Sequence, residues 1–237
     1  AALAVRLCHQ AGIPEEAFQL LPGAGEVGEM ITSDPRIAGV AFTGSTQTAQ
    51  AINRGLAARE GPIATLIAET GGQNAMIVDS TALAEQVVSD AVSSALGSAG
   101  QRCSALRVLF LQDEIAARVT DMLAGAMAEL VVGDPGLLAT DVGPVIDAEA
   151  LAPLEDHARR MEREGRLIYR TALSETCAHG TFFAPRAFEI DRMDLLEGEV
   201  FGPILHVISY AADRLDEGTY QQIRLRFDPD APPLSFF

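Results

Sequence analysis

The stretch ALGSAGQRCSALRVLFL, residues 95–111, joins a helix-like run to an apolar, strand-like run through a turn of small residues. A single cysteine, Cys103, stands at the break. A thiol in such a turn is exposed and has backbone N–H groups around it, which suits a cysteine nucleophile. Cys103 is therefore the candidate nucleophile, and an ordinary buried cysteine is the alternative.

A cysteine nucleophile works with a base, and the sequence offers a carboxylate upstream. Residues 68–74 read AETGGQN, so Glu69 follows an apolar run and precedes paired glycines. Carboxylates act as general bases when the fold places them near the reacting group. We expect the chain to bring Glu69 and Cys103 together.

Apolar runs and helix-like segments alternate along the chain, which is typical of a parallel α/β sheet. The expected strands are 18–21, 37–42, 62–68, 75–78, 107–111, 166–170 and 204–210, with a short edge strand at 181–185. The main expected helices are 46–58, 81–99, 113–132 and 148–164. The sequence therefore predicts an α/β fold.

Two loops have compositions that favour binding, and each also has a purely structural explanation. Phe42 leads into Thr43-Gly44-Ser45-Thr46 and then a helix, whose N-terminus would attract an anion such as a pyrophosphate. The alternative is a helix cap by Ser45 or Thr46. Residues 197–203 read EGEVFGP, which suits either a recognition loop or a turn with exposed acids.

The composition narrows the possible functions. The net charge is −16 and every basic residue is Arg, so a nucleic-acid partner and catalytic lysine chemistry are not expected. Three separated cysteines and four scattered histidines give no metal-ligand spacing. The apolar runs are too short to span a membrane, and the odd cysteine count without a signal-like segment favours the cytoplasm.

Four segments, taken in order, resemble the signature elements of the aldehyde dehydrogenase superfamily. They are Phe42–Thr46, Glu69–Gly72, Gly100–Cys103 and Glu199–Pro203. The neighbouring residues are similar to the L-glutamate-γ-semialdehyde (pyrroline-5-carboxylate) dehydrogenase branch, and most to that module of bifunctional proline utilization A proteins. The resemblance covers about residues 1–217.

This resemblance implies a chemistry and a role for each motif. Cys103 would attack the aldehyde, hydride would pass to NAD, and Glu69 would activate the water that hydrolyses the thioester. The expected NAD-binding residues are Gly44, Ser45, Thr46, Glu199 and Phe201, and Ser104 would help to bind the substrate carboxylate.

The resemblance also implies an organisation into parts. Residues 1–68 would be the end of a Rossmann-type NAD-binding domain, 69–217 most of the catalytic domain, and 218–237 a divergent tail, for which we consider a frameshift. By this resemblance the chain is a piece truncated at both ends, and we expect it to be inactive alone. The full-length parent would be a homo-oligomer, and a fused proline dehydrogenase module is considered for it. The alternatives are a non-catalytic remnant, a different aldehyde substrate, or a cysteine-dependent acyl transferase without a nicotinamide.

Overall fold

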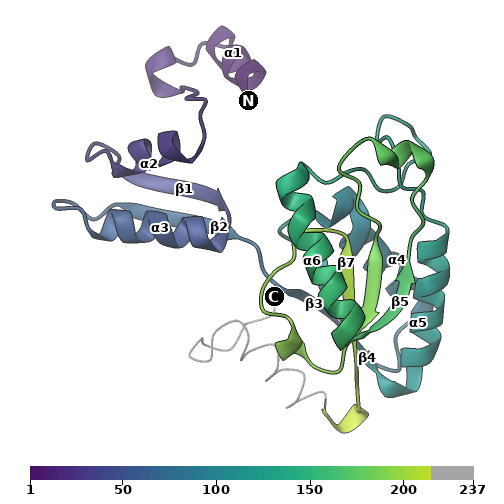
Figure 1. Cartoon of the computed structure of the whole chain (residues 1–237). Coiled ribbons are helices and arrows are strands. Elements are labelled where there is room, and N and C mark those ends of the chain that lie inside the picture. Colours follow the sequence, from purple (N-terminus) through teal and green to yellow (C-terminus); the bar gives the residue numbers. More distant parts are fainter. Residues whose placement is uncertain (215–237) are drawn as a thin grey trace. The chain divides into compact units, whose positions relative to one another are not determined.

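The computed structural model describes residues 1–214, and the chain divides into two compact units. The first unit is Ala1–Thr70 and the second begins at Gly71. Figure 1 shows the elements of each unit. The predicted tail 218–237 lies outside the described residues, and the predicted domain assignment stays a prediction.

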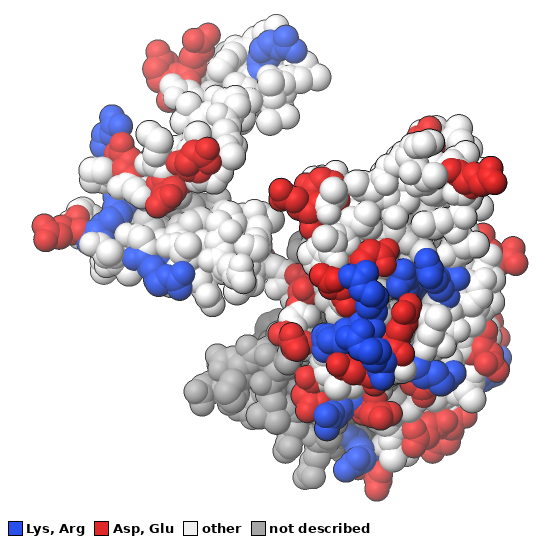
Figure 2. Space-filling model, in the orientation of Figure 1, with Lys and Arg blue, Asp and Glu red and all other residues white. Residues whose placement is uncertain are grey.

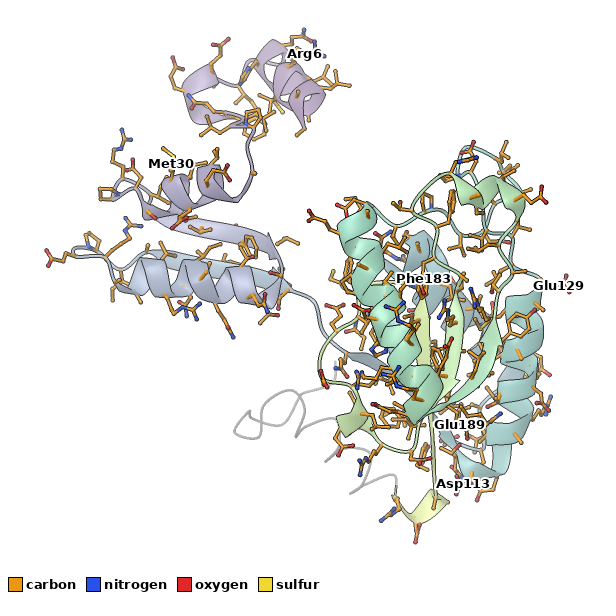
Figure 3. The ribbon with its side chains drawn as sticks, viewed as in Figure 1. Arg6, Met30, Asp113, Glu129, Phe183 and Glu189 are labelled. Atoms are coloured by element: carbon orange, nitrogen blue, oxygen red, sulfur yellow. The ribbon has the colours of Figure 1, made fainter. Side chains whose placement is uncertain are left out.

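The first unit is a two-stranded parallel sheet with helices beside it (Figure 1). Its elements are α1 (Ala2–Gln10), α2 (Gly25–Ser33), β1 (Gly39–Gly44), α3 (Thr46–Ala57) and β2 (Thr65–Thr70), with a short 3-10 turn η1 (Glu15–Ala17). Of its apolar residues, Ala49 and Leu56 are buried, whereas Met30 on α2 is exposed (Figure 3).

One expected strand of this unit is wrong. Residues 18–21 are not a strand, and Phe18 and Leu21 are exposed. An apolar run forms a strand only where a neighbouring strand accepts its hydrogen bonds, and in the described part of the chain this run has no such neighbour.

The second unit is a five-stranded sheet with helices packed against it. The strands are β3 (Asn74–Val78), β4 (Leu106–Gln112), β5 (Arg166–Arg170), β6 (Arg186–Glu189) and β7 (Ile204–Tyr210), and the helices are α4 (Ala84–Leu96), α5 (Asp113–Ala128) and α6 (Ala148–Glu164). Short 3-10 turns are η2 (Gly97–Gly100), η3 (Glu175–Ala178), η4 (Met193–Leu195) and η5 (Ala212–Arg214).

The strand order is β3-β4-β7-β6-β5, with parallel neighbours except for the antiparallel pair β5–β6. Every residue of β4 is buried, and so is almost every residue of β7. Continuous apolar strands of this kind are covered on both faces by helices. Phe110 and Phe183 are among the largest fully buried side chains, and Figure 3 marks the position of Phe183.

Helix α6 carries its charges on the surface that it turns to solvent. Asp147 caps the helix by accepting a hydrogen bond from the Ala150 N–H at 2.8 Å. Arg and acidic side chains alternate over this part of the molecule in Figure 2, and Arg160 pairs with Glu164 one turn away at 3.3 Å. The opposite side of α6 buries Leu154 and Met161 against the sheet.

The predicted α/β class is confirmed, and only the β5–β6 pair is antiparallel among the strand pairs of residues 1–214. The expected edge strand at 181–185 is wrong, because the strand β6 begins only after Pro185, which has no N–H to donate. Within residues 1–214, no helix is long and apolar enough to cross a membrane.

Candidate active site

The turn that carries Cys103 has an unusual backbone. Helix α4 ends at Leu96, and Ser98, Ala99 and Gly100 then take left-handed conformations with φ of 55°, 52° and 65°. A left-handed conformation is unfavourable for residues that have a Cβ atom, so the surrounding structure must hold the turn in place. The turn ends at Cys103, which is exposed as predicted.

Two amide side chains hold this turn. Asn74, the first residue of β3, donates from Nδ2 to the carbonyl oxygens of Cys103 at 2.7 Å and Ala105 at 3.0 Å. Gln101 accepts from the Ile146 N–H at 2.9 Å. Among the described residues, the Cys103 N–H has no acceptor, so it is available to stabilise an oxyanion.

The turn also packs directly on the loop that contains Glu199. A Cβ atom at Gly100 would overlap with the carbonyl group of Gly202, and φ of +65° at Gly100 further favours glycine. Glycine at position 100 therefore lets the two backbones touch. The sequence motifs around Cys103 and Glu199 are thus adjacent in the second unit, as the resemblance implies.

Glu199 is held by a residue that the sequence did not single out. The buried Arg107 donates from Nη2 to Glu199 Oε1 at 3.1 Å, and its guanidinium lies 5.4 Å from the centre of the Phe201 ring. Burial lowers the pKa of the Arg107 guanidinium, and Glu199 opposes this shift. The sequence feature that could have pointed to Arg107 is its charge at the start of the otherwise apolar run RVLFL.

A pocket of about 600 Å³ opens beside these groups. Glu199 and Phe201 form one part of its wall, and Ser98 and Gln101 of the turn form another. The remaining lining is mainly apolar and comes from Ile146, Val200 and the first turns of α6, namely Ala150, Pro153 and Leu154. A mostly apolar pocket with a few polar groups at its edge is typical of cofactor and substrate sites.

The predicted pyrophosphate motif lies in the first unit, at the N-terminus of α3. Ser45 caps this helix by accepting from the Thr48 N–H at 3.1 Å, so the cap explanation holds. The cap does not use the N–H groups of Thr46 and Gln47, for which the described residues supply no acceptor. A Cβ atom at Gly44 would lie 2.5 Å from the Phe42 ring. This helix end fits an anionic group.

Glu69 lies at the same edge of the first unit's sheet. It is exposed near the carboxyl end of β2 and faces Thr43 of β1 in the strand register. Ligands of parallel α/β sheets bind at the carboxyl ends of the strands. Glu69 belongs to the first unit and Cys103 to the second, and their pairing stays a prediction. Ser104 is exposed directly after Cys103.

Two buried histidines lie beneath Arg107. His206 Nδ1 donates to the Arg107 carbonyl oxygen at 3.1 Å, so in the neutral ring Nε2 accepts from His157 Nε2–H at 2.9 Å. Burial is the main cause that lowers the pKa of His157 to about 4 and of His206 to about 3. Within residues 1–214, no group of His, Cys, Asp and Glu is arranged to hold a metal ion.

The second unit thus combines an exposed thiol in a left-handed turn, the Glu199 loop packed against that turn, and a mostly apolar pocket. The sequence profile of the aldehyde dehydrogenase family matches residues 1–218, and the chain belongs to this family.

Within this family, the chain is similar to proteins of two names. The bifunctional protein PutA of Klebsiella aerogenes is 51% identical over 226 residues, which are 92% of this chain and 17% of that protein. The 1-pyrroline-5-carboxylate dehydrogenase of Geobacillus kaustophilus is 33% identical over 85% of this chain and 40% of that protein.

Solved structures agree with these relatives. A crystal structure of a mutant of Bradyrhizobium japonicum proline utilization A (PutA) has a TM-score of 0.91 and 52% identity over 95% of this chain and 23% of that one. The 1-pyrroline-5-carboxylate dehydrogenase from Thermus with bound NAD has a TM-score of 0.82 and 32% identity, over 89% of this chain and 41% of that one. The chain thus spans less than half the length of each of these proteins.

Proposed function

We propose that the chain is the part of an NAD-dependent aldehyde dehydrogenase that carries the nucleophile, and that the whole protein oxidises L-glutamate γ-semialdehyde to L-glutamate. The exposed Cys103, in a turn that packs directly against the Glu199 loop, is the observation that carries this proposal. The relatives named PutA and 1-pyrroline-5-carboxylate dehydrogenase support the choice of substrate.

In this proposal Cys103 begins the reaction. Its thiolate attacks the aldehyde carbon, and the carbonyl oxygen becomes the alkoxide of a hemithioacetal. The Cys103 N–H lies in the turn beside this developing charge and stabilises it. Ser104, the next residue, donates to the carboxylate at the far end of the substrate.

NAD, when bound, supplies the oxidant that accepts the hydride from the hemithioacetal carbon, which leaves a thioester on Cys103. The chain's own groups fit two parts of such a cofactor, the pyrophosphate and a ribose. The α3 N-terminus after Gly44, with Ser45 and Thr46, suits the pyrophosphate. The Glu199 carboxylate suits a ribose diol, and Phe201 lies beside it.

Glu69 completes the cycle as general base. It takes a proton from water, the hydroxide attacks the thioester carbon, and the acid leaves as the Cys103 thiolate is released. Glu69 returns its proton to solvent, so one aldehyde, one water and one NAD⁺ would yield one carboxylic acid, one NADH and one proton.

The setting of the whole protein is part of the proposal. The relatives at about half identity are named bifunctional, so we include a second module, a proline dehydrogenase, in the same polypeptide. The proposal also keeps the homo-oligomeric assembly that the resemblance implies and the cytoplasmic location that the cysteine pattern favours. The third alternative, acyl transfer without a nicotinamide, is disfavoured because it gives Glu199 and the α3 N-terminus no role.

Turnover of glutamate semialdehyde by the full-length protein tests the proposal. NADH formation should be abolished by Cys103→Ala, while the matched change Cys8→Ala should leave the rate within a factor of about two, because Cys8 lies outside the proposed site. Aldehyde oxidation that survives Cys103→Ala would overturn the assignment.

A further inference from the structure

Arg107 occupies an irregular position in the sheet. In the pairing of β3 with β4, Asn74 lies opposite Leu106 and Ala75 lies opposite Val108, so Arg107 is an additional residue on β4. Such a bulge interrupts the ladder and redirects the side chain of the bulged residue. The Arg107 carbonyl oxygen accepts instead from the His206 side chain.

The redirected guanidinium joins the two loops of the proposed site. It donates to the carbonyl oxygens of Arg102 at 3.3 Å and Gly202 at 3.0 Å, and to the Glu199 carboxylate at 3.1 Å. Arg102 directly precedes the nucleophile, whereas Gly202 and Glu199 belong to the other loop. The Arg107 side chain is only 3% exposed, so water cannot replace these partners easily.

The Glu199 carboxylate is confined from two sides. Oε1 accepts from Arg107, and Oε2 lies where a Cβ atom at position 71 would be if Gly71 were any other residue. Within residues 1–214, Arg107 is the cation that pairs with Glu199. The neighbouring acid Glu197 is 83% exposed and its contact with Arg160 is 3.8 Å long.

A second buried arginine shows what a purely structural ion pair looks like in this sheet. Arg186 of β6 is also 3% exposed, but its partners are Glu155 at 3.2 Å and Glu162 at 3.3 Å, both on α6. Its guanidinium lies 4.8 Å from the centre of the Phe183 ring. None of these groups belongs to the proposed site, so Arg186 is a matched reference for Arg107.

We propose that Arg107 is a positioning residue, which fixes the Glu199 carboxylate in the place from which it binds the cofactor's nicotinamide ribose. This inference rests on the proposed function, because it takes Glu199 to be the ribose-binding group. The bulge, the His206 hydrogen bond and the glycine at position 71 are then the features that set where this carboxylate lies.

The test compares Arg107→Met with Arg186→Met in the full-length protein. Both changes remove a buried cation, so both should lower the melting temperature. Arg107→Met should also raise the Kd for NAD, measured by calorimetry, by about tenfold, the effect of losing one charge-assisted interaction. Its KM for the aldehyde should change by less than about twofold, and Arg186→Met should leave NAD binding within the same limit.

A double-mutant cycle separates positioning from general damage. Because Arg107 acts through Glu199, the variant with both Arg107→Met and Glu199→Gln should bind NAD no more weakly than the worse single variant. If Arg107→Met does not fold, Arg107→Lys and Gly71→Ala replace it. The lysine keeps the charge and should lose less affinity, and the alanine displaces the carboxylate without changing Arg107.

The outcomes distinguish this inference from the proposed function. Additive effects in the cycle, or unchanged NAD affinity in a folded Arg107 or Gly71 variant while Glu199→Gln weakens binding, would overturn the positioning role alone. Unchanged NAD affinity in Glu199→Gln itself would overturn the proposed cofactor site, and the positioning role with it.

Discussion

Cys103 differs from the other cysteines in exposure and in how its backbone is held. Cys177 is buried and hydrogen-bonded, and Cys8 is half-buried, whereas Cys103 is exposed. Asn74 fixes the carbonyl groups on either side of Ser104. A nucleophile must be accessible to substrate and yet have a fixed position. The Asn74 side chain fixes the backbone here while the Cys103 side chain stays exposed.

Removal of the Asn74 amide should loosen the turn. Asn74→Ala loses two hydrogen bonds to partly exposed carbonyl oxygens, so the free energy of unfolding should fall by about 1 kcal/mol. The rate at which iodoacetamide alkylates Cys103 should rise, as followed by peptide mass spectrometry. The control Asn53→Ala changes an exposed residue inside α3, so it should leave the alkylation of Cys103 unchanged and should not lower the free energy of unfolding. Unaltered stability and alkylation in Asn74→Ala would contradict this role.

The sequence predicted some site residues and missed others for a physical reason. Cys103 and Glu199 stand in loops, where a motif directly exposes its chemistry. Arg107 and His206 stand inside strands, and their contacts depend on a bulge and on strand order, which sequence spacing does not reveal. Asn74 was visible in the motif after Glu69, but its reach to Cys103 depends on the pairing of β3 with β4.

At the scale of single elements, the end of α4 is the informative difference. The sequence predicted a helix to Ala99, but α4 ends at Leu96 and the next residues turn left-handed. Small residues continue a helix without difficulty, so local propensity favoured the longer helix. Tertiary packing of Gly100 against Gly202 determines the actual path. In contrast, helix 148–164 and strands 166–170 and 204–210 were predicted to the residue.

The left-handed turn predicts that a change from serine to glycine has opposite effects on stability at two positions, one in the turn and one in helix α4. Ser98→Gly should stabilise the protein by roughly 0.5 kcal/mol, because relief of a left-handed φ outweighs the extra chain entropy of glycine in the unfolded state. Ser89→Gly, in the exposed part of α4, should destabilise it by a similar amount. Urea unfolding measures both, and destabilisation by Ser98→Gly would show that the turn carries no such strain.

At the scale of the whole molecule, the two units differ in the size of their hydrophobic cores. The first unit buries little beyond Ala49 and Leu56, and its sheet has two strands. The second unit holds the contiguous hydrophobic cluster that runs from Val78 to Tyr210. The sequence predicted the α/β class because strand and helix periodicities are local. These local patterns do not show which strands pair, so the two-part organisation expected in the sequence analysis came from the family resemblance and not from periodicity.

The buried histidine pair should make the stability of the second unit depend on pH. Above about pH 6.5 both rings are neutral in the folded and unfolded states. Below it, the unfolded chain binds protons that the folded rings refuse until about pH 4 at His157 and about pH 3 at His206. Stability should therefore fall as pH falls, by roughly 2 kcal/mol per ring at pH 5.

Urea unfolding at pH 7 and pH 5 measures this loss. His206→Asn removes one titrating ring and keeps a donor for the Arg107 carbonyl oxygen, so the pH dependence should shrink. The exposed His179, changed to Asn, should leave it unaltered. An undiminished pH dependence in His206→Asn would mean that other groups cause it.

The acyl intermediate on Cys103 is the most direct test of the proposed chemistry. In the full-length protein, Glu69→Gln removes the base that hydrolyses the thioester, so incubation with NAD and glutamate semialdehyde should add a glutamyl group to the Cys103 peptide. Mass spectrometry should find this adduct in Glu69→Gln and not in the variant that also carries Cys103→Ala. NADH formation without any adduct on Cys103 would contradict the account.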